Sequence, residues 1–573
     1  MDPIVLCDRC QTQLLPSITR RIQYFPVVSN DLLRSDMVPT STDMQQLVHS
    51  HIKEEEYVLA KYDQEISRLH KLVERLQAQR CALLEQVERR QSWLAPIRRL
   101  PDEILEEVFA AVYHVPNPDP GYSLDTSGLS KAQIVPTVNL THVSHRWRRV
   151  VSASVRLWSS IRITLPPRCQ VDVEALLRLH LAQSKLYPLD IVLSNNTVGS
   201  ADEDPEFSTT LLALGMLSPH FSRIRSLSLW IPEGFLGLMS IPHPLDFPFL
   251  YCFESRFTTF SEWFLDALCR APRLANVSTR ALLDQTEFPY HQLTSLNLNG
   301  IENLIDLLMT LRWCTSLESL QLHDIIAAES DMFMLDTWST CVELPLLHHL
   351  SMISWTDAVL VSNFLRQFKL PRLASIKITM MDQWGEELPE WEDDAPSFAA
   401  FADLVRGPRC HVREFTLHTN SLQYSDTDVH EFLMLSSELV QLEVNIIAHG
   451  HQDAGTFAYT LFDVLSRPFL GSVLAPNLAK ISVEETAASD ASDAFNVHQE
   501  TAFHILDMVE LRKTRHKGAS NHSKKRTPLE IIVQFGPGGY WEGCDQTVRR
   551  SVNARFRKLA EDGMNCTIRG RIP

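Results

Sequence analysis

Several features that define whole classes of proteins are missing from this 573-residue sequence. It has no apolar run of about 18 residues, the length that a membrane-spanning helix requires. The first residues lack the basic start and apolar stretch of a secretory signal. Its 11 cysteines follow no disulfide-like rhythm, which favours reduced thiols. The sequence therefore predicts a cytoplasmic or nuclear protein with no membrane partner.

An excess of positive charge is also missing. The 53 Lys and Arg residues are outnumbered by 70 Asp and Glu residues, which gives a formal net charge of −17. Broad binding to nucleic acid is therefore unexpected. Two local basic clusters remain, at residues 512–517 and 524–526. They are compatible with a nuclear-localisation signal, a patch for an acidic partner, or a solvated loop.

Signatures of catalysis and of structural metal sites are absent as well. The sequence contains no HExxH, GxSxG, Walker or kinase motif, so we expect a protein that is not an enzyme and that holds no cofactor. Cys7 and Cys10 have the spacing of half a zinc site, but no second pair with metal-like spacing follows. Gly536–Gly539 follows an apolar run without the Lys of a phosphate-binding loop, which favours a simple turn.

What the sequence does contain begins with a long helical repeat. Apolar residues recur at alternating steps of four and three, and only Glu55, Arg80 and Arg90 interrupt them. The apolar members of this series are Val48, Ile52, Leu59, Tyr62, Ile66, Leu69, Val73, Leu76, Leu83, Val87 and Leu94. Such a repeat predicts a coiled-coil helix over residues 44–95, after an irregular arm over 1–43. A homodimer is favoured, and a single helix folded back on the protein is the alternative.

Two short amphipathic helices are expected within residues 96–165. In the first, Leu100, Ile104, Leu105, Val108, Phe109 and Val112 form one wide apolar stripe. Pro101 suits the first helical turn, so this helix should begin near it. In the second, Val143, Trp147, Val150 and Val151 share a face, and the pair Leu157-Trp158 follows. Residues 114–137, rich in Pro and Gly, predict a loop between the two helices.

The order of these pieces resembles the F-box family. The residues concerned are LPDEILEEVF at 100–109, VSHRWRRV at 143–150 and LWSSI at 157–161. The resemblance implies a helical module that binds the Skp-type adaptor of a cullin-RING ubiquitin ligase. Two departures are Ser144, at a position that is often cysteine in the family, and the inserted loop 114–137.

The resemblance gives a set of residues that either bind the adaptor or form the core of the module. They are Leu100, Pro101, Ile104, Leu105, Val108, Phe109, Val143, Trp147, Leu157 and Trp158. Trp147 is the best core candidate. Leu100, Pro101, Ile104 and Leu105 are expected to be partly exposed and to contact the adaptor, because interfaces favour apolar anchors within a polar rim.

Residues 166–573 repeat a short L-x-x-L-x-L pattern that is typical of strands. Its middle positions are Leu227, Leu296, Leu320, Leu350, Ile376, Phe415, Leu442 and Ile481, with a degenerate copy at Val277. Helix-period runs lie between the copies. The copies resemble leucine-rich repeats, although most lack the asparagine of that family, and they imply an irregular solenoid with a parallel sheet. An ordinary α/β domain is the alternative.

The expected fold class is therefore α/β. By resemblance, the function is that of a substrate-recognition subunit of an SCF-type (cullin-RING) ubiquitin ligase. Its partners would be a Skp-type adaptor, a cullin through that adaptor, and an unknown protein target. The alternative is a coiled-coil scaffold that does not recruit the ligase.

Overall fold

A computed structural model covers the chain and describes most of its residues. The described residues are 5–7, 12–13, 41–113, 136–165, 172–195, 205–231, 246–256, 260–280, 282, 287–301, 303–325, 341–354, 358–380, 397–406, 410–419, 422, 424–447, 456–467, 473–486, 501, 503–512, 530–535, 550, 554–555, 557–558 and 565–570. The chain divides into two compact units, Met1–Leu105 and Glu106–Pro573.

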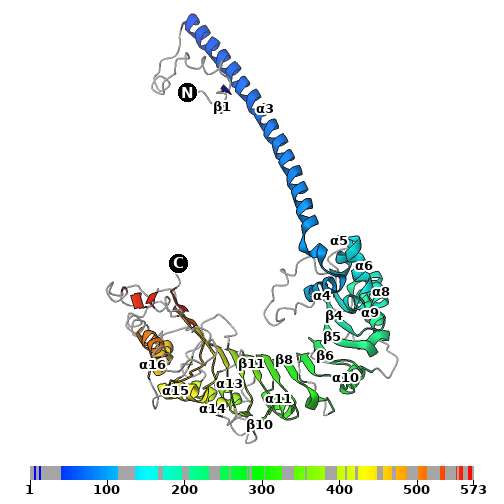
Figure 1. Ribbon diagram of the computed structural model, residues 1–573, viewed down its shortest axis with the longest axis vertical. Helices are drawn as coiled ribbons and strands as arrows, with labels where there is room; N and C mark the ends of the chain where they lie inside the picture. The colour runs from blue at the N-terminus through cyan, green and yellow to red at the C-terminus, as the bar shows by residue number, and fades with distance from the viewer. Residues whose placement is uncertain are drawn as a thin grey trace. The chain divides into compact units, whose positions relative to one another are not determined.

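The first unit contains one long helix. Strands β1 (Val5–Cys7) and β2 (Thr12–Gln13) form a short antiparallel pair before it. Helix α3 (Thr42–Leu94) runs without interruption for 53 residues, as Figure 1 shows. The Ser41 hydroxyl accepts a hydrogen bond from the Met44 N–H at 3.2 Å and caps its first turn. Pro96 opens the short 3-10 helix η1 (Pro96–Arg99) directly after α3 ends.

Four short helices follow in sequence. They are α4 (Asp102–Tyr113), α5 (Pro136–Val143), α6 (His145–Ala153) and α7 (Val155–Ser159). Asp102 and Glu103 occupy the first turn of α4, where acidic side chains complement the positive end of the helix dipole. The start predicted near Pro101 is therefore observed.

Among the described residues, the rest of the second unit is built on one parallel sheet of 14 strands. In spatial and sequence order the strands are β3 (Ser160–Leu165), β4 (Leu189–Asn195), β5 (Ile224–Trp230), β6 (Cys252–Ser255), β7 (Asn276–Thr279), β8 (Ser295–Ile301), β9 (Ser319–Ile325), β11 (His349–Ser354), β13 (Ser375–Met380), β14 (Glu414–Thr419), β15 (Gln441–Ile447), β16 (Lys480–Thr486), β17 (Glu530–Phe535) and β18 (Asn565–Gly570). Each strand thus pairs with the strands that precede and follow it in this series. A separate parallel pair joins β10 (Val342–Glu343) to β12 (Phe368–Lys369).

Helices cover one face of this sheet. They are α8 (Val173–Gln183), α9 (Pro205–Leu217), α10 (Glu262–Cys269), α11 (Leu304–Leu311), α13 (Ala358–Leu365), α14 (Phe398–Val405), α15 (Asp426–Leu435) and α16 (Thr456–Ser466). Short 3-10 helices η3 (Ser218–Arg223) and η5 (Tyr290–Gln292) precede β5 and β8. Figure 1 shows α10, α11, α14 and α15 on one side of the strands, and none of the described helices covers the opposite strand face, which is called the uncovered face below.

The core of the second unit lies between this sheet and its helices. Residues at alternate strand positions, such as Leu320 and Leu322, are buried, as are the apolar faces of the neighbouring helices. Phe415 of β14 lies 4.8 Å from Phe432 of α15, measured between ring centroids. Each strand and helix thus buries its apolar face mainly against its neighbours in sequence.

The expected fold class, α/β with a parallel sheet, is confirmed. Every strand predicted from the L-x-x-L-x-L pattern is present, and the predicted middle positions are register partners, as for Leu320, Leu350 and Ile376. Strands β3, β4, β6 and β18 of the sheet were not predicted. The predicted boundary at residue 165 falls after β3, so the sheet begins inside the segment assigned to the helical module. Among the described residues, no helix is both long and apolar enough to cross a membrane.

Candidate functional site

The first candidate site is the set of short helices α4 to α7, where all but the first two of the predicted site residues lie. Their burial separates them into three groups. Leu105, Phe109, Leu157 and Trp158 are buried, Leu100 and Trp147 are half-buried, and Pro101, Ile104, Val108 and Val143 are exposed. The prediction that Leu105 is partly exposed is wrong, because its exposed fraction is 0%. Its neighbour Ile104 is 49% exposed.

Aromatic residues hold the helices together. Phe109 of α4 contacts Trp147 of α6, with ring centroids 4.7 Å apart. The Trp158 indole N–H donates to the Val151 carbonyl at 2.8 Å, so its one polar group is satisfied although the side chain is buried. The fully buried Thr137 hydroxyl donates to the Leu157 carbonyl at 3.3 Å. These contacts join α4 to α6, α7 to α6 and α5 to α7.

The segment before α6 differs from the prediction. Val143 was expected to share a helical face with Trp147, but it ends α5 and is 58% exposed. Ser144 is extended and separates the two helices, and its hydroxyl accepts a hydrogen bond from the Trp147 N–H at 3.1 Å. Serine at this position therefore has a structural role as the N-cap of α6.

The predicted loop 114–137 also ends two residues earlier than expected. Helix α5 begins at Pro136, whose fixed φ suits the first turn of a helix, and Thr137 follows it into the core. Residues 114–135 of this prediction lie outside the described residues.

Polar contacts fix α4 against the start of α7. Glu106 accepts a hydrogen bond from the Ser154 hydroxyl at 2.5 Å. Glu107 forms an ion pair with Arg156 at 2.9 Å. The apolar side chains of α4 then divide between two faces, because Phe109 points into the core while Val108 and Val112 are 37% and 66% exposed. Ile104, Val108 and Val112 recur every fourth residue and form an exposed apolar stripe.

Trp158 also connects the helices to the sheet. Its ring meets the His180 ring of α8 edge-on at 5.0 Å, and the His180 imidazole contacts the Trp158 carbonyl at 3.2 Å. Burial lowers the pKa of His180, although the backbone contact acts in the opposite direction. This histidine is therefore a packed core residue at the junction of α7 and α8.

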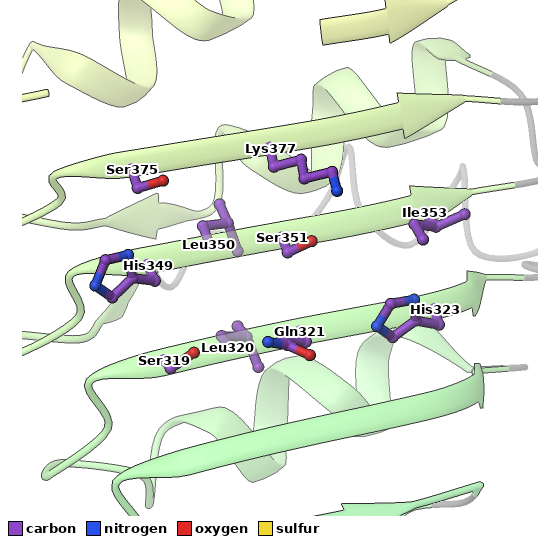
Figure 2. A pocket seen from close by; sticks show the side chains of 10 residues that line it. All are labelled: Ser319, Leu320, Gln321, His323, His349, Leu350, Ser351, Ile353, Ser375 and Lys377. Atoms are coloured by element: carbon purple, nitrogen blue, oxygen red, sulfur yellow. The ribbon is translucent and has the colours of Figure 1, made fainter. Parts of the chain in front are cut away.

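The second candidate site lies on the uncovered face of the sheet. A hollow of about 180 Å³ is lined by Ser319, Leu320, Gln321, His323, His349, Leu350, Ser351, Ile353, Ser375 and Lys377, from β9, β11 and β13. In one row of register partners the short Ser351 stands between Gln321 and Lys377, as Figure 2 shows. The difference in side-chain length creates the hollow.

The polar groups that line this hollow are neutral or positively charged. Its lining offers hydroxyl, amide, imidazole and ammonium groups, and none of the described residues that line it is Asp or Glu, although the whole chain carries a net charge of −17. In the neighbouring row the long His349 stands between Ser319 and Ser375. The sequence pattern gave no signal for this hollow, because it depends on which side chains become neighbours when strands align.

Two arginines that might be taken for binding residues have structural roles. Arg512, which the sequence placed in a basic cluster, is buried and donates to the carbonyls of Leu474 and Ala475 at 2.8 and 3.0 Å. Burial lowers its pKa to about 10. Arg223 is buried too and donates to the carbonyls of Lys185 and Tyr187. Both Ala475 and Lys185 have positive φ angles, so each arginine stabilises a left-handed turn.

Several other predictions lie outside the described residues. They concern Cys10, Gly536–Gly539 and the remaining members of the two basic clusters, at 513–517 and 524–526. Within the described part of the chain, no three His, Cys, Asp or Glu side chains come together in a way that would hold a metal ion.

Comparison with known proteins does not identify a family for this chain. No protein-family model matches it, and no curated protein matches it either.

Proposed function

We propose that this protein is a substrate-recognition subunit of an SCF-type ubiquitin ligase. In this proposal α4 to α7 bind a Skp-type adaptor, which brings a cullin, and the sheet unit binds the target protein. The observation that carries it is the exposed apolar stripe of α4, Ile104, Val108 and Val112, on a helix whose opposite face is fixed to α6 and to the start of α7. The chain acts by bringing two proteins together and performs no chemistry itself.

The α4 stripe has the composition of a docking surface. Its apolar side chains stand beside Glu103 and Glu107, so an apolar centre is bordered by charge, as in protein interfaces. Leu105 and Phe109 occupy the buried face of the same helix. They hold α4 in place and are not available to a partner.

For the target, the proposal assigns the uncovered face of the sheet. The hollow between β9, β11 and β13 presents hydrogen-bond donors and the Lys377 ammonium without any carboxylate. That chemistry suits an acidic segment of a target protein.

Co-expression with the Skp-type adaptor tests the proposal. Wild-type protein should co-purify with the adaptor in equal amounts, and Ile104→Asp with Val108→Asp should abolish the complex because two charges would be buried in an apolar interface. Met309→Asp is the matched control, since Met309 is an exposed apolar residue of similar exposure on α11. Circular dichroism would establish that all three proteins are folded.

The outcomes separate the two functions. Loss of the adaptor only in the α4 variant supports the ligase subunit. A folded wild-type protein that never binds the adaptor would refute it and would favour a scaffold without ligase recruitment.

A further inference from the structure

Helix α3 exposes an apolar seam along its whole length. Val58 is its one buried residue, whereas nine apolar residues of the seam are exposed. They are Val48, Ile52, Leu59, Ile66, Val73, Leu76, Leu83, Val87 and Leu94. Soluble proteins rarely leave a continuous apolar surface of this length in water, so the seam calls for a second helix.

The seam residues define the core positions of a heptad repeat. Ile52, Leu59, Ile66, Val73, Val87 and Leu94 fall at one core position together with Arg80. Val48, Tyr62, Leu69, Leu76 and Leu83 fall at the other, together with Glu55 and Arg90. Ile and Val hold four of the seven first positions and Leu holds three of the seven second positions, so the seam is mainly aliphatic and a second helix can pack against it.

The three charged residues of the seam determine the direction of the second strand. In a parallel, in-register dimer each residue faces its own copy, so Glu55 would face Glu55, Arg80 would face Arg80 and Arg90 would face Arg90. Each of these layers would bring like charges together in a partly desolvated seam. A parallel pair therefore carries three repulsive layers.

One antiparallel register removes all three of these conflicts. If Val48 lies opposite Val87 of the second copy, then Ile52 meets Leu83, Leu59 meets Leu76 and Ile66 meets Leu69. In the same register Glu55 lies opposite the second copy's Arg80, and by symmetry this ion pair occurs twice. Arg90 meets Gln45, which is polar and uncharged.

This register also uses the entire helix. It places Ser41 opposite Leu94 of the second copy, and these residues lie at the two ends of α3. A shift of one heptad in either direction places Glu55 opposite Val73 or Val87, which buries an unpaired carboxylate against an apolar side chain. The charges and the length of the helix therefore select the same alignment.

We propose that α3 forms an antiparallel homodimer in which Glu55 of each copy pairs with Arg80 of the other. The residues that follow Leu94 then leave from opposite ends of a rod about 80 Å long, given 1.5 Å per helical residue. This arrangement is independent of whether α4 binds an adaptor.

Charge exchange in the full-length chain tests the pairing. Sedimentation equilibrium should show that Glu55→Arg raises the dimer Kd about 30-fold, since two attractive pairs become repulsive. Arg80→Glu should raise it by a similar factor. The double variant Glu55→Arg with Arg80→Glu should restore the wild-type Kd, because it only exchanges the two charges. Glu54→Arg and Arg75→Glu, on the outer face of the helix, are the matched controls.

The alternatives give different results. In a parallel dimer each single exchange replaces one like-charged layer by another, so the Kd would stay near that of the wild type and the proposal would be overturned. A wild-type protein that stays monomeric at 100 times the concentration used for purification would overturn it as well. Single variants that weaken the dimer without rescue in the double variant would also contradict the pairing.

Discussion

Two adjacent residues of α4 give the sharpest test of how this helix is oriented. Leu105 has no exposed surface, whereas Ile104 is 49% exposed. Leu105→Ala should lower the free energy of opening of α4 by about 3 kcal/mol, because truncating a fully buried leucine removes its apolar contacts and leaves a cavity, which costs roughly 2–5 kcal/mol. Ile104→Ala should lower it by at most about 1 kcal/mol, because half of the side chain already contacts water.

Amide hydrogen exchange resolved by mass spectrometry would measure these changes locally, because the chain has more than one unit and global unfolding need not be two-state. Peptides from α4 and α6 should lose protection in Leu105→Ala and keep it in Ile104→Ala. Leu186→Ala, at a residue 91% exposed, is the control for a leucine truncation outside any core. Equal losses of protection in the two α4 variants would refute the assigned orientation of the helix.

Three further predictions concern buried polar groups. Burial lowers the pKa of His180, so the imidazole binds a proton more readily in the unfolded chain than in the folded one. Stability should therefore decrease as the pH falls below 6.5. Urea unfolding should show a smaller loss of stability between pH 7.5 and pH 5.5 in His180→Phe than in the wild type. Arg512→Met should lower the free energy of unfolding by about 2–3 kcal/mol, since two buried carbonyls lose their donor, and an unchanged urea midpoint would contradict that role. Burial raises the pKa of Cys314 to about 12, so iodoacetamide at pH 8 should alkylate exposed Cys81 and leave Cys314 intact. Peptide mass spectrometry would measure the extent of alkylation at each cysteine. Equal alkylation of the two cysteines would be inconsistent with the fold.

The sheet could be predicted in large part because alternating burial leaves a direct mark on the sequence. The pattern was visible in most strands whose core positions are both aliphatic or aromatic, as at Leu320 and Leu322, but β4 was missed although Ile191 and Leu193 are buried. In β6 the second buried position is Ser255, so the strand carries one apolar core residue, Phe253, and was missed. Strand β3 was missed for a different reason, because all of its residues, Ser160–Leu165, were assigned to the helical module.

The candidate site could be predicted less well. Periodicity identifies the apolar stripe of α4, but a wide stripe includes both Leu105 and Ile104, and only the packing of Phe109 against Trp147 determines which edge faces water. The exposure of Val143 follows from the break at Ser144, which a helical pattern alone does not reveal. Arg512 belongs to a basic run in the sequence, yet it is buried and donates hydrogen bonds to two carbonyls.

The measurement that tests the central proposal most directly is assembly with the ligase components themselves. Wild-type protein would be mixed with purified Skp-type adaptor and cullin, and the mixture analysed by size-exclusion chromatography with light scattering. The proposed function predicts one species that contains all three proteins and that disappears when the adaptor is omitted. Separate elution of this chain from an intact adaptor–cullin complex would contradict it.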